Sequence, residues 1–303
     1  MTAKSPAIPP LAWVFLAGLA LLWGTSFLSN RLVLQGMGPF TTVFFRTAGA
    51  AILLWAVAVA RCRPVRLDPR IIGNFIVLGL ISCAMPFSLI VWGQQYITSG
   101  LTAILSASSA VLGVASAALV FRDEQLTPRR LIGVLLGFAG VIVAIGPETL
   151  DGISLTSVGQ FAILGSSLCY ALSGVYTRVA SRGVAPEIAA AALMTTAALW
   201  MAPLMLIVEG MPRFDWPMHV SMALIWLIVA CTTIAYLLYF RLLALAGAGN
   251  SALVTLLIPP VAIAAGVIVL GERLTLTEVL GFLIIAVGLC ILSGWPGRRV
   301  KTP

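Results

Sequence analysis

The chain has 303 residues, of which 60% belong to the apolar set and only 9% are charged. An ordinary soluble domain carries about 25% charged residues, so this composition excludes a soluble globular protein. The formal net charge is +8, but too few basic residues lie between the apolar blocks to form a phosphate-binding surface, so we expect no nucleic-acid partner.

The apolar residues fall in continuous blocks, and the run from Ile71 to Phe121 contains no charged residue. About 20 apolar residues cross the hydrocarbon core as a helix, and the blocks lack the period-two alternation of a membrane barrel. The sequence therefore predicts an all-α integral membrane protein. In chain order, ten transmembrane helices are expected at 11–33, 39–60, 71–96, 100–121, 130–146, 157–180, 186–208, 219–246, 250–270 and 278–295.

Basic residues indicate the orientation of these spans, because Lys and Arg concentrate in cytoplasmic connections. With the N-terminus inside, most arginines fall in inner connections, and the outer ones hold only Arg31, Arg213 and Arg273. We therefore predict a multi-pass protein of the cell inner (plasma) membrane with both termini cytoplasmic and the lipid bilayer as its surroundings.

The two halves of the chain resemble each other. At an offset of 147 residues Arg31 aligns with Arg178, and at 148 the pattern Glu-x-Leu-Thr recurs. Five spans per repeat is an odd number, so the second repeat must enter the membrane from the opposite side. The sequence predicts two inverted five-helix repeats, 1–147 and 148–303, with substrate bound between them near the midplane.

Several motifs resemble those of a known family. The first span contains LLWGTSFLSNR, the second opens at Pro39 and carries Phe45 and Arg46, and RDEQLT recurs as LGERLT before the last span. In order and spacing they resemble the drug/metabolite transporter superfamily, specifically its ten-span EamA-type exporters. The resemblance implies an inner-membrane carrier that exports small metabolites. Bacterial amino-acid exporters, including those for aromatic amino acids, look most similar.

Polar and aromatic side chains inside the spans are candidates for binding substrate. Trp23, Ser26 and Asn30 share one helix face, because residues three, four or seven apart lie on the same side. Tyr170 and Ser173 occupy the repeat-equivalent positions, so we expect both stripes to face one cavity. Other spans contribute Ser88, Trp92, Ser106, Ser109, Tyr236 and Tyr239. Ordinary helix packing is the alternative for the serines. For the aromatic residues the alternative is ordinary packing or an aromatic belt at the membrane interface.

Arg46 lies about seven residues inside the second span, where a charge must face protein or water. Either it anchors a substrate carboxylate through paired hydrogen bonds, or it clamps backbone carbonyls at a helix end. The repeat-equivalent residue is Leu193. The fold therefore does not require a charge at this position, which favours the clamp.

All ten acidic residues lie in connections or in the first turns of spans. With no carboxylate near the midplane to carry a proton, we expect facilitated diffusion or weak coupling. Five dispersed cysteines and a single histidine offer neither a metal site nor a catalytic cluster, so no cofactor and no enzymatic activity are expected.

Prolines inside spans free a backbone carbonyl and bend the helix. We predict that they act as hinges for alternating access. They are Pro86 in the third span and Pro259 and Pro260 in the ninth. Kinks without a function are the alternative.

These patterns predict a carrier that exports small metabolites by alternating access through a central cavity. Neutral or aromatic amino acids are the substrate class that they favour. A nucleotide-sugar or phosphorylated-sugar antiporter is an alternative, but anionic substrates of that kind demand several cavity Lys or Arg residues, and Arg46 is the one clear candidate. A membrane-embedded enzyme is an alternative of another class. The oligomeric state is left open.

Overall fold

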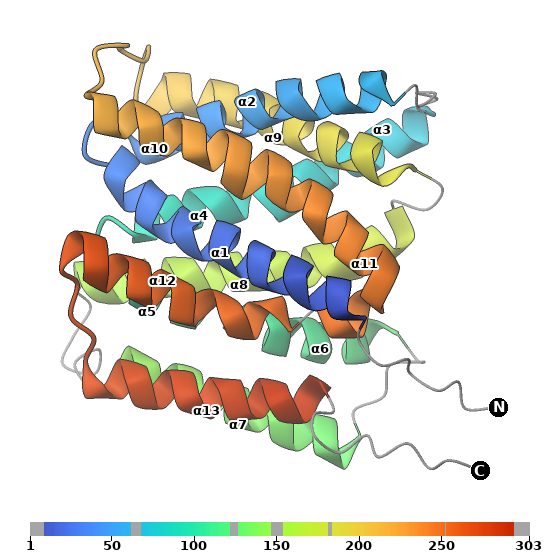
Figure 1. Cartoon of the computed structure of the whole chain (residues 1–303), viewed down its shortest axis with the longest axis vertical. Helices are drawn as coiled ribbons and strands as arrows, with labels where there is room; N and C mark the ends of the chain where they lie inside the picture. The colour runs from blue at the N-terminus through green and yellow to red at the C-terminus, as the bar shows by residue number, and fades with distance from the viewer. Residues whose placement is uncertain are drawn as a thin grey trace.

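The computed structural model describes residues 9–61, 68–121, 127–146, 154–180, 184–251 and 253–293. Its elements are helices, with η marking π-helical segments: α1 (Pro10–Val33), α2 (Pro39–Ala60), α3 (Pro69–Gly79), η1 (Leu80–Ala84), α4 (Met85–Gly93), α5 (Ser99–Ser106), α6 (Ser108–Val120), α7 (Pro128–Ile145), α8 (Leu155–Ala180), α9 (Pro186–Val208), α10 (Met218–Ile228), η3 (Val229–Ile234), α11 (Ala235–Ser251), α12 (Val254–Leu270) and α13 (Leu276–Ser293). In Figure 1 they run across the view, with α2 and α9 at the top, α1, α8 and α12 in the middle, and α7 with α13 at the bottom.

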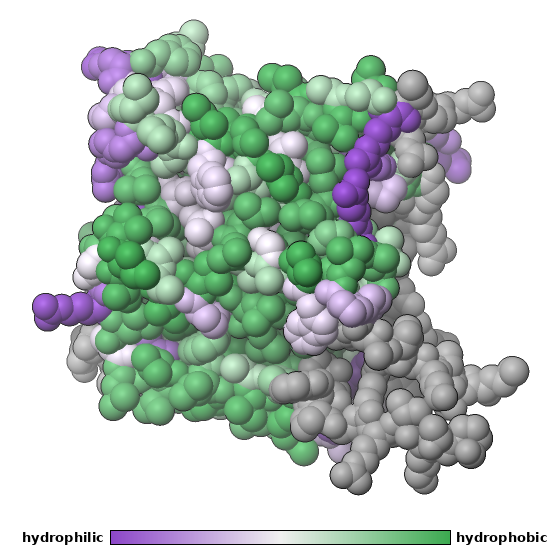
Figure 2. Space-filling view, in the orientation of Figure 1, coloured by the Kyte–Doolittle hydropathy of each residue, from purple (hydrophilic) through white to green (hydrophobic). Residues whose placement is uncertain are grey.

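Within the described residues, eight helical stretches are long and apolar enough to cross a membrane, and two shorter apolar helices follow them at Val254–Leu270 and Leu276–Leu292. Helices therefore lie at all ten predicted positions. The predicted ninth span begins too early, because α11 continues to Ser251 and the next helix starts at Val254. Figure 2 shows a face that is mostly hydrophobic between its two ends, as contact with lipid tails requires.

Prolines begin several of these helices. Pro39, Pro128 and Pro186 each stand in the first turn of their helix, where the missing N–H of proline leaves no hydrogen bond unmade and its fixed φ suits a helix. Thr127 adds a side-chain cap, because its hydroxyl accepts a hydrogen bond from Arg130 N at 3.3 Å.

Two helical stretches widen into a π-helical segment. In η1 the N–H of Met85 bonds to Leu80 O, five residues back. Pro86 follows at once and has no N–H to offer a carbonyl four residues back, so the wider turn relieves its clash with the preceding turn. The segment η3 contains no proline, and its widening was not predicted from the sequence.

The helix α12 continues from Val254 to Leu270 with Pro259 and Pro260 inside it. The two prolines thus lie inside one continuous helix. Membrane helices tolerate proline where neighbouring groups satisfy the freed carbonyls. The hinge role of these prolines and of Pro86 stays a prediction.

The helices α7 and α13 cross at very short range. A Cβ atom on Gly133 would lie 2.9 Å from Gly288 O, and one on Gly140 would lie 2.8 Å from Gly281 O. Only glycine permits this separation, and close packing of this kind is the main source of helix association in lipid. This pair has the most extensive contact between any two helices of the described residues.

The pair α2 and α9 is joined at both ends. At one end the carboxylate of Glu209 accepts hydrogen bonds from Phe40 N at 2.9 Å and Thr41 N at 2.7 Å. At the other end Arg61 Nη1 lies 2.6 Å from Glu187 Oε1. A carboxylate at a helix N-terminus satisfies free N–H groups and complements the helix dipole.

Candidate functional site

Arg46 lies in the interior, where α2 meets α4 and η3, with 5% of its surface exposed. Its Nε donates a hydrogen bond of 2.9 Å to Thr232 Oγ1. Its guanidinium carbon lies 4.1 Å from the centre of the Phe87 ring, a cation–π contact. Among the described residues no carboxylate forms an ion pair with Arg46. A polar hydroxyl and an aromatic face therefore compensate the desolvated charge.

Two of the predicted tyrosines lie beside Arg46. Tyr170 and Tyr236 pack against one buried cluster from α2, α4, η1 and α9, and this cluster contains Phe87, the ring that Arg46 contacts. The hydroxyl of Tyr236 lies 3.6 Å from Cys83 Sγ. The fold thus brings together residues from four separate spans. We call this group the Arg46 site: Arg46, Phe87, Tyr170, Thr232 and Tyr236.

A row of aromatic rings leads from the Arg46 site to α1. The Tyr236 ring centre lies 6.4 Å from that of Phe240, which lies 5.9 Å from that of Tyr239. Tyr239 in turn lies 5.6 Å from Trp23, centre to centre. Three of these four rings were sequence candidates, and Phe240 was not. The row gives the site a large apolar surface with few directional demands.

A cavity of about 230 Å³ lies between α6 and α8. Ser109 and Tyr170 line it, together with small residues such as Gly113 and Gly174. Tyr170 therefore touches both the cavity and the cluster around Arg46. The cavity and the Arg46 site are neighbours that share one tyrosine.

Hydrogen bonds close the end of the bundle where α1 ends and α5 begins, at the left of Figure 1. Asn30 Nδ2 donates to Gln94 Oε1 at 2.9 Å, and Arg31 Nη1 donates to Gln94 O at 2.6 Å. Glu272 accepts hydrogen bonds from Ser99 N at 3.0 Å and from Ser99 Oγ at 3.1 Å. We call these five residues the end network. Asn30, a predicted binding residue, belongs to it.

Two of the other predicted serines bond within their own helix, and two do not. Ser26 Oγ donates to Trp23 O at 2.6 Å and Ser173 Oγ to Tyr170 O at 2.9 Å, each within its own helix. Ser88 Oγ lies 3.2 Å from Met201 Sδ in α9. Ser106 Oγ is buried and has no hydrogen-bond partner among the residues that the structure describes.

Trp92 lies away from the Arg46 site. Its ring centre is 5.1 Å from that of Tyr96, close to the end of α4. The structure thus does not bring it to Arg46, Tyr170 and Tyr236.

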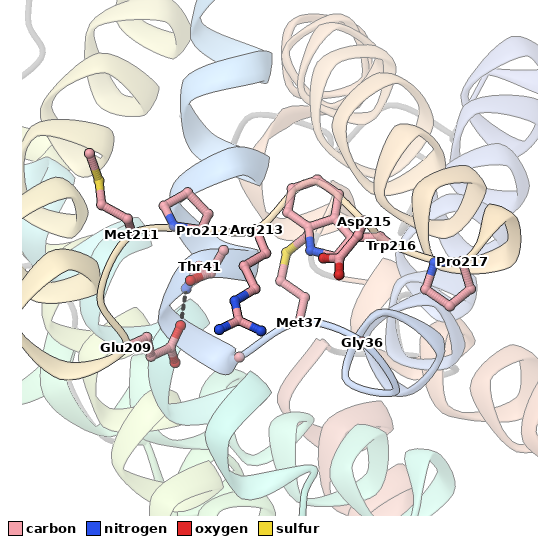
Figure 3. Close-up of a pocket in the computed structure, with 11 residues that line it drawn as sticks. Gly36, Met37, Thr41, Glu209, Met211, Pro212, Arg213, Asp215, Trp216 and Pro217 are labelled. Atoms are coloured by element: carbon pink, nitrogen blue, oxygen red, sulfur yellow. Dashed lines mark hydrogen bonds between the residues drawn. The ribbon is translucent and has the colours of Figure 1, made fainter.

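A second, larger cavity of about 430 Å³ opens between the α1–α2 and α9–α10 connections. Figure 3 shows Arg213 extending into it near Asp215 and Glu209, with Glu209 turned towards Thr41. The Arg213 side chain is exposed and, in the described part of the chain, forms no ion pair. This cavity is a polar recess at the surface.

Sequence reasoning missed Thr232, Phe87, Gln94 and Glu272 as site residues. The Glu-x-Leu-Thr repeat did single out Glu272, but as a sign of duplication. Thr232 and Phe87 carry no pattern of their own, because their role depends on where α2 lies beside them. Among the described residues no group of three His, Cys, Asp or Glu side chains forms that could hold a metal.

The Arg46 site combines a guanidinium with an aromatic, mostly apolar surround. Planar anions bind guanidinium through paired hydrogen bonds. The tyrosine hydroxyls add groups that both donate and accept hydrogen bonds. Such a site is suited to a small molecule with one planar anionic group and an apolar body.

The chain is similar to known transporters along most of its length. The sequence profile of the EamA-like transporter family matches it twice, at 10–146 and 157–294. The uncharacterized transporter YvbV of Bacillus subtilis is 27% identical over 281 residues, covering 92% of this chain and 90% of that protein. The "Probable amino-acid metabolite efflux pump" of Escherichia coli is 25% identical, covering 90% of this chain and 91% of the pump.

A solved crystal structure shares the fold. It matches with a TM-score of 0.68 and 18% sequence identity, covering 93% of this chain and 98% of the other.

Proposed function

The chain belongs to the EamA-like transporter family, and from this premise we propose that it is a carrier that exports neutral or aromatic amino acids from the cell by alternating access. The proposal depends on one observation above the others. Arg46 is the one buried basic side chain among those described, and it lies where the two halves meet, beside tyrosine and phenylalanine. The similarity to an amino-acid metabolite efflux pump supports the same substrate class.

The proposed architecture is ten membrane crossings arranged as two inverted repeats, 1–147 and 148–303. Its support is a reciprocal pattern of contacts. Gly133 approaches Gly288, and Gly140 approaches Gly281. At an offset of 148 residues, Gly281 is the equivalent of Gly133 and Gly288 is the equivalent of Gly140. The two contacts are therefore the same contact with the two halves exchanged. An exchange of this kind is the property of a contact across a twofold axis. The double match of the family profile also supports the repeat.

The segments η1 and η3 support the repeat in a second way. Residues 80–84 and 229–234 both follow the first eleven residues of the third helical stretch of their half. Two rare wide turns at matching positions are expected if both halves descend from one unit. In Figure 1, α1 begins and α13 ends at the same side of the molecule, as an even number of crossings demands.

We propose the inner membrane as the location, with the side where α1 begins facing the cytoplasm. Arg61, Arg70, Arg129 and Arg130 lie at that side, and the positive-inside rule assigns such a side to the cytoplasm. The end network then closes the outer end. The cavity beside Tyr170 lies towards the cytoplasmic end of α6 and α8.

The buried charge favours amino acids over phosphorylated sugars. A sugar nucleotide carries several negative charges, and each needs a cation or a hydrogen-bond donor in a dry site. The interior offers Arg46 alone as a buried basic group among the described side chains. A carboxylate with an apolar side chain matches one guanidinium surrounded by rings. Transport of this kind is binding without catalysis, so we assign no enzymatic activity.

Counterflow in proteoliposomes tests the proposal. Liposomes that contain the purified protein are loaded with unlabelled amino acid and diluted into labelled amino acid, with no proton gradient imposed. We expect uptake of labelled phenylalanine and tryptophan above that of protein-free liposomes. Uptake of sugar nucleotides but of no amino acid would replace this proposal with the antiporter. Flux that appears only with an imposed proton gradient would contradict facilitated transport.

A further inference from the structure

Arg46 reaches across the interface between the halves to one hydroxyl. Its Nε donates to Thr232 Oγ1 at 2.9 Å. Arg46 comes from α2, whereas Thr232 comes from η3, far along the chain. Both side chains are buried, with 5% and 0% of their surfaces exposed. A charged hydrogen bond in such surroundings is short and strongly directional.

The wide turn of η3 orients the Thr232 hydroxyl. Thr232 Oγ1 donates to Leu227 O, five residues back, at 2.7 Å. In the regular helix α2, Thr47 instead donates to Val43 O, four residues back. The single hydroxyl proton of Thr232 is thus occupied by its own helix, and the oxygen accepts from Arg46 with its lone pairs. The acceptor role is fixed.

Phe87 blocks one face of the guanidinium. The ring centre lies 4.1 Å from the guanidinium carbon. Because Nε already donates to Thr232, the guanidinium edge that contains Nε cannot bind a second group. The other edge, formed by the two Nη atoms, remains available to donate hydrogen bonds. In the described part of the chain, no hydrogen bond or ion pair reaches those Nη atoms.

We propose that Thr232 is a positioning residue that holds Arg46 with its Nη edge presented to a single carboxylate, so that the carrier selects substrates with one carboxylate. The inference rests on the proposed function. Two parallel Nη–H donors match the two oxygens of one carboxylate. A second anionic group on the substrate finds no buried basic partner among the described side chains, so dianions are disfavoured.

Thr233 provides a matched control for Thr232. Its hydroxyl also donates five residues back, to Ile228 O at 2.8 Å, and its side chain is also buried. It accepts no hydrogen bond from Arg46, whose Nε bonds to Thr232. Thr232→Val and Thr233→Val thus remove equivalent hydroxyls from the same wide turn, but only one of them holds the arginine.

The first experiment measures counterflow of phenylalanine and of phenethylamine, which lacks the carboxylate. Thr232→Val should raise the apparent KM for phenylalanine about tenfold with little change in maximal rate, because the charged hydrogen bond positions the binding edge. Phenethylamine flux should not change. Thr232→Ser should restore the parental KM, and Thr233→Val should keep it. Equal losses for both compounds, or equal effects of both valine variants, would show a structural role instead and overturn the proposal.

The second experiment measures binding without transport. Thermal unfolding of the purified protein in detergent is followed with benzoate, benzamide or phthalate. Benzoate should stabilise the parent and Thr232→Ser more than benzamide does, phthalate should do no better than benzoate, and Thr232→Val should lose the benzoate effect. If benzoate stabilises no form, the proposal is wrong. Benzoate binding without any amino-acid counterflow would leave this inference standing while the proposed function fails.

Discussion

Glu272 lies 3.8 Å from Arg31, measured from Oε1 to Nε, while the same carboxylate accepts the backbone N–H of Ser99 at 3.0 Å. One carboxylate thus joins the end of α1, the start of α5 and the connection before α13. Its side chain is 8% exposed and that of Arg31 is 34% exposed. At this burial the interaction is less screened than a surface ion pair.

Glu272→Gln tests this junction. The variant keeps the size of the side chain but loses the charge that Ser99 and Arg31 face, so the free energy of unfolding should fall by about 1 to 3 kcal/mol. A cysteine placed at the buried Ile97 position should also react faster with a thiol reagent, because this end opens more often. Asp215→Asn is the control, since Asp215 is exposed at the same end. Identical labelling rates in both variants would contradict the closing role of Glu272.

The substitution Arg46→Gln tests whether Arg46 anchors a substrate carboxylate or only clamps the protein structure. If Arg46 binds the carboxylate, all amino acids should bind more weakly together, by about 1 to 3 kcal/mol, because each loses the same charged hydrogen bonds. Counterflow KM values for a panel of amino acids measure this change. Arg241→Gln, which alters an exposed arginine of α11, should leave them unchanged. A folded Arg46→Gln protein with parental KM values would identify Arg46 as a structural clamp.

The substitutions Trp23→Ala and Tyr170→Ala test whether these two rings contact the side chain of the substrate. Both residues are partly buried beside aromatic or apolar neighbours, and aromatic faces favour large apolar side chains without demanding one geometry. The order of preference among amino acids should change in each variant, with the largest loss for aromatic substrates. Competition of unlabelled amino acids against labelled phenylalanine measures it. An unchanged order in both variants would remove these rings from the site.

The positions of the helices were predictable because membrane spans need a minimum length of apolar sequence, and prolines such as Pro39 and Pro186 set where several begin. The interior site was predictable only in part. Arg46 and Tyr170 became candidates because a charge or a tyrosine inside an apolar span is conspicuous. Thr232 resembles any other threonine in the sequence. It accepts a hydrogen bond from Arg46 because of a wide turn, and no proline in the sequence indicates that turn.

Gly140→Ala tests the crossing of α7 and α13. A Cβ there would lie 2.8 Å from Gly281 O, so the helices must separate, and the free energy of unfolding should fall by about 1 to 3 kcal/mol. Gly73→Ala is the control, because a Cβ at Gly73 meets no atom within 4 Å. Thermal unfolding in detergent compares the two. Equal melting temperatures would mean that the crossing relaxes without loss.

Cysteine labelling from outside intact cells tests the proposed orientation. Pro69 begins α3 at the side proposed to face the cytoplasm, and Met211 follows α9 at the opposite side. In a background without the native cysteines, a cysteine at Met211, which is 82% exposed, should react with an impermeant reagent. A cysteine at Pro69 should react only after the membrane is permeabilised. The reverse result would invert the topology.

The close pairing of α7 with α13 has a consequence for biogenesis. A ribosome makes α7 near the middle of the chain and α13 last, so the glycine face of α7 enters the lipid long before Gly281 and Gly288 are synthesised. Until then the main contacts of α7 within the described residues of the first half are with α5 and α6. Truncation before α13 therefore leaves Gly133 and Gly140 of α7 without the helix against which they pack. The packing of α7 against α13 can form only after the last helix has been synthesised.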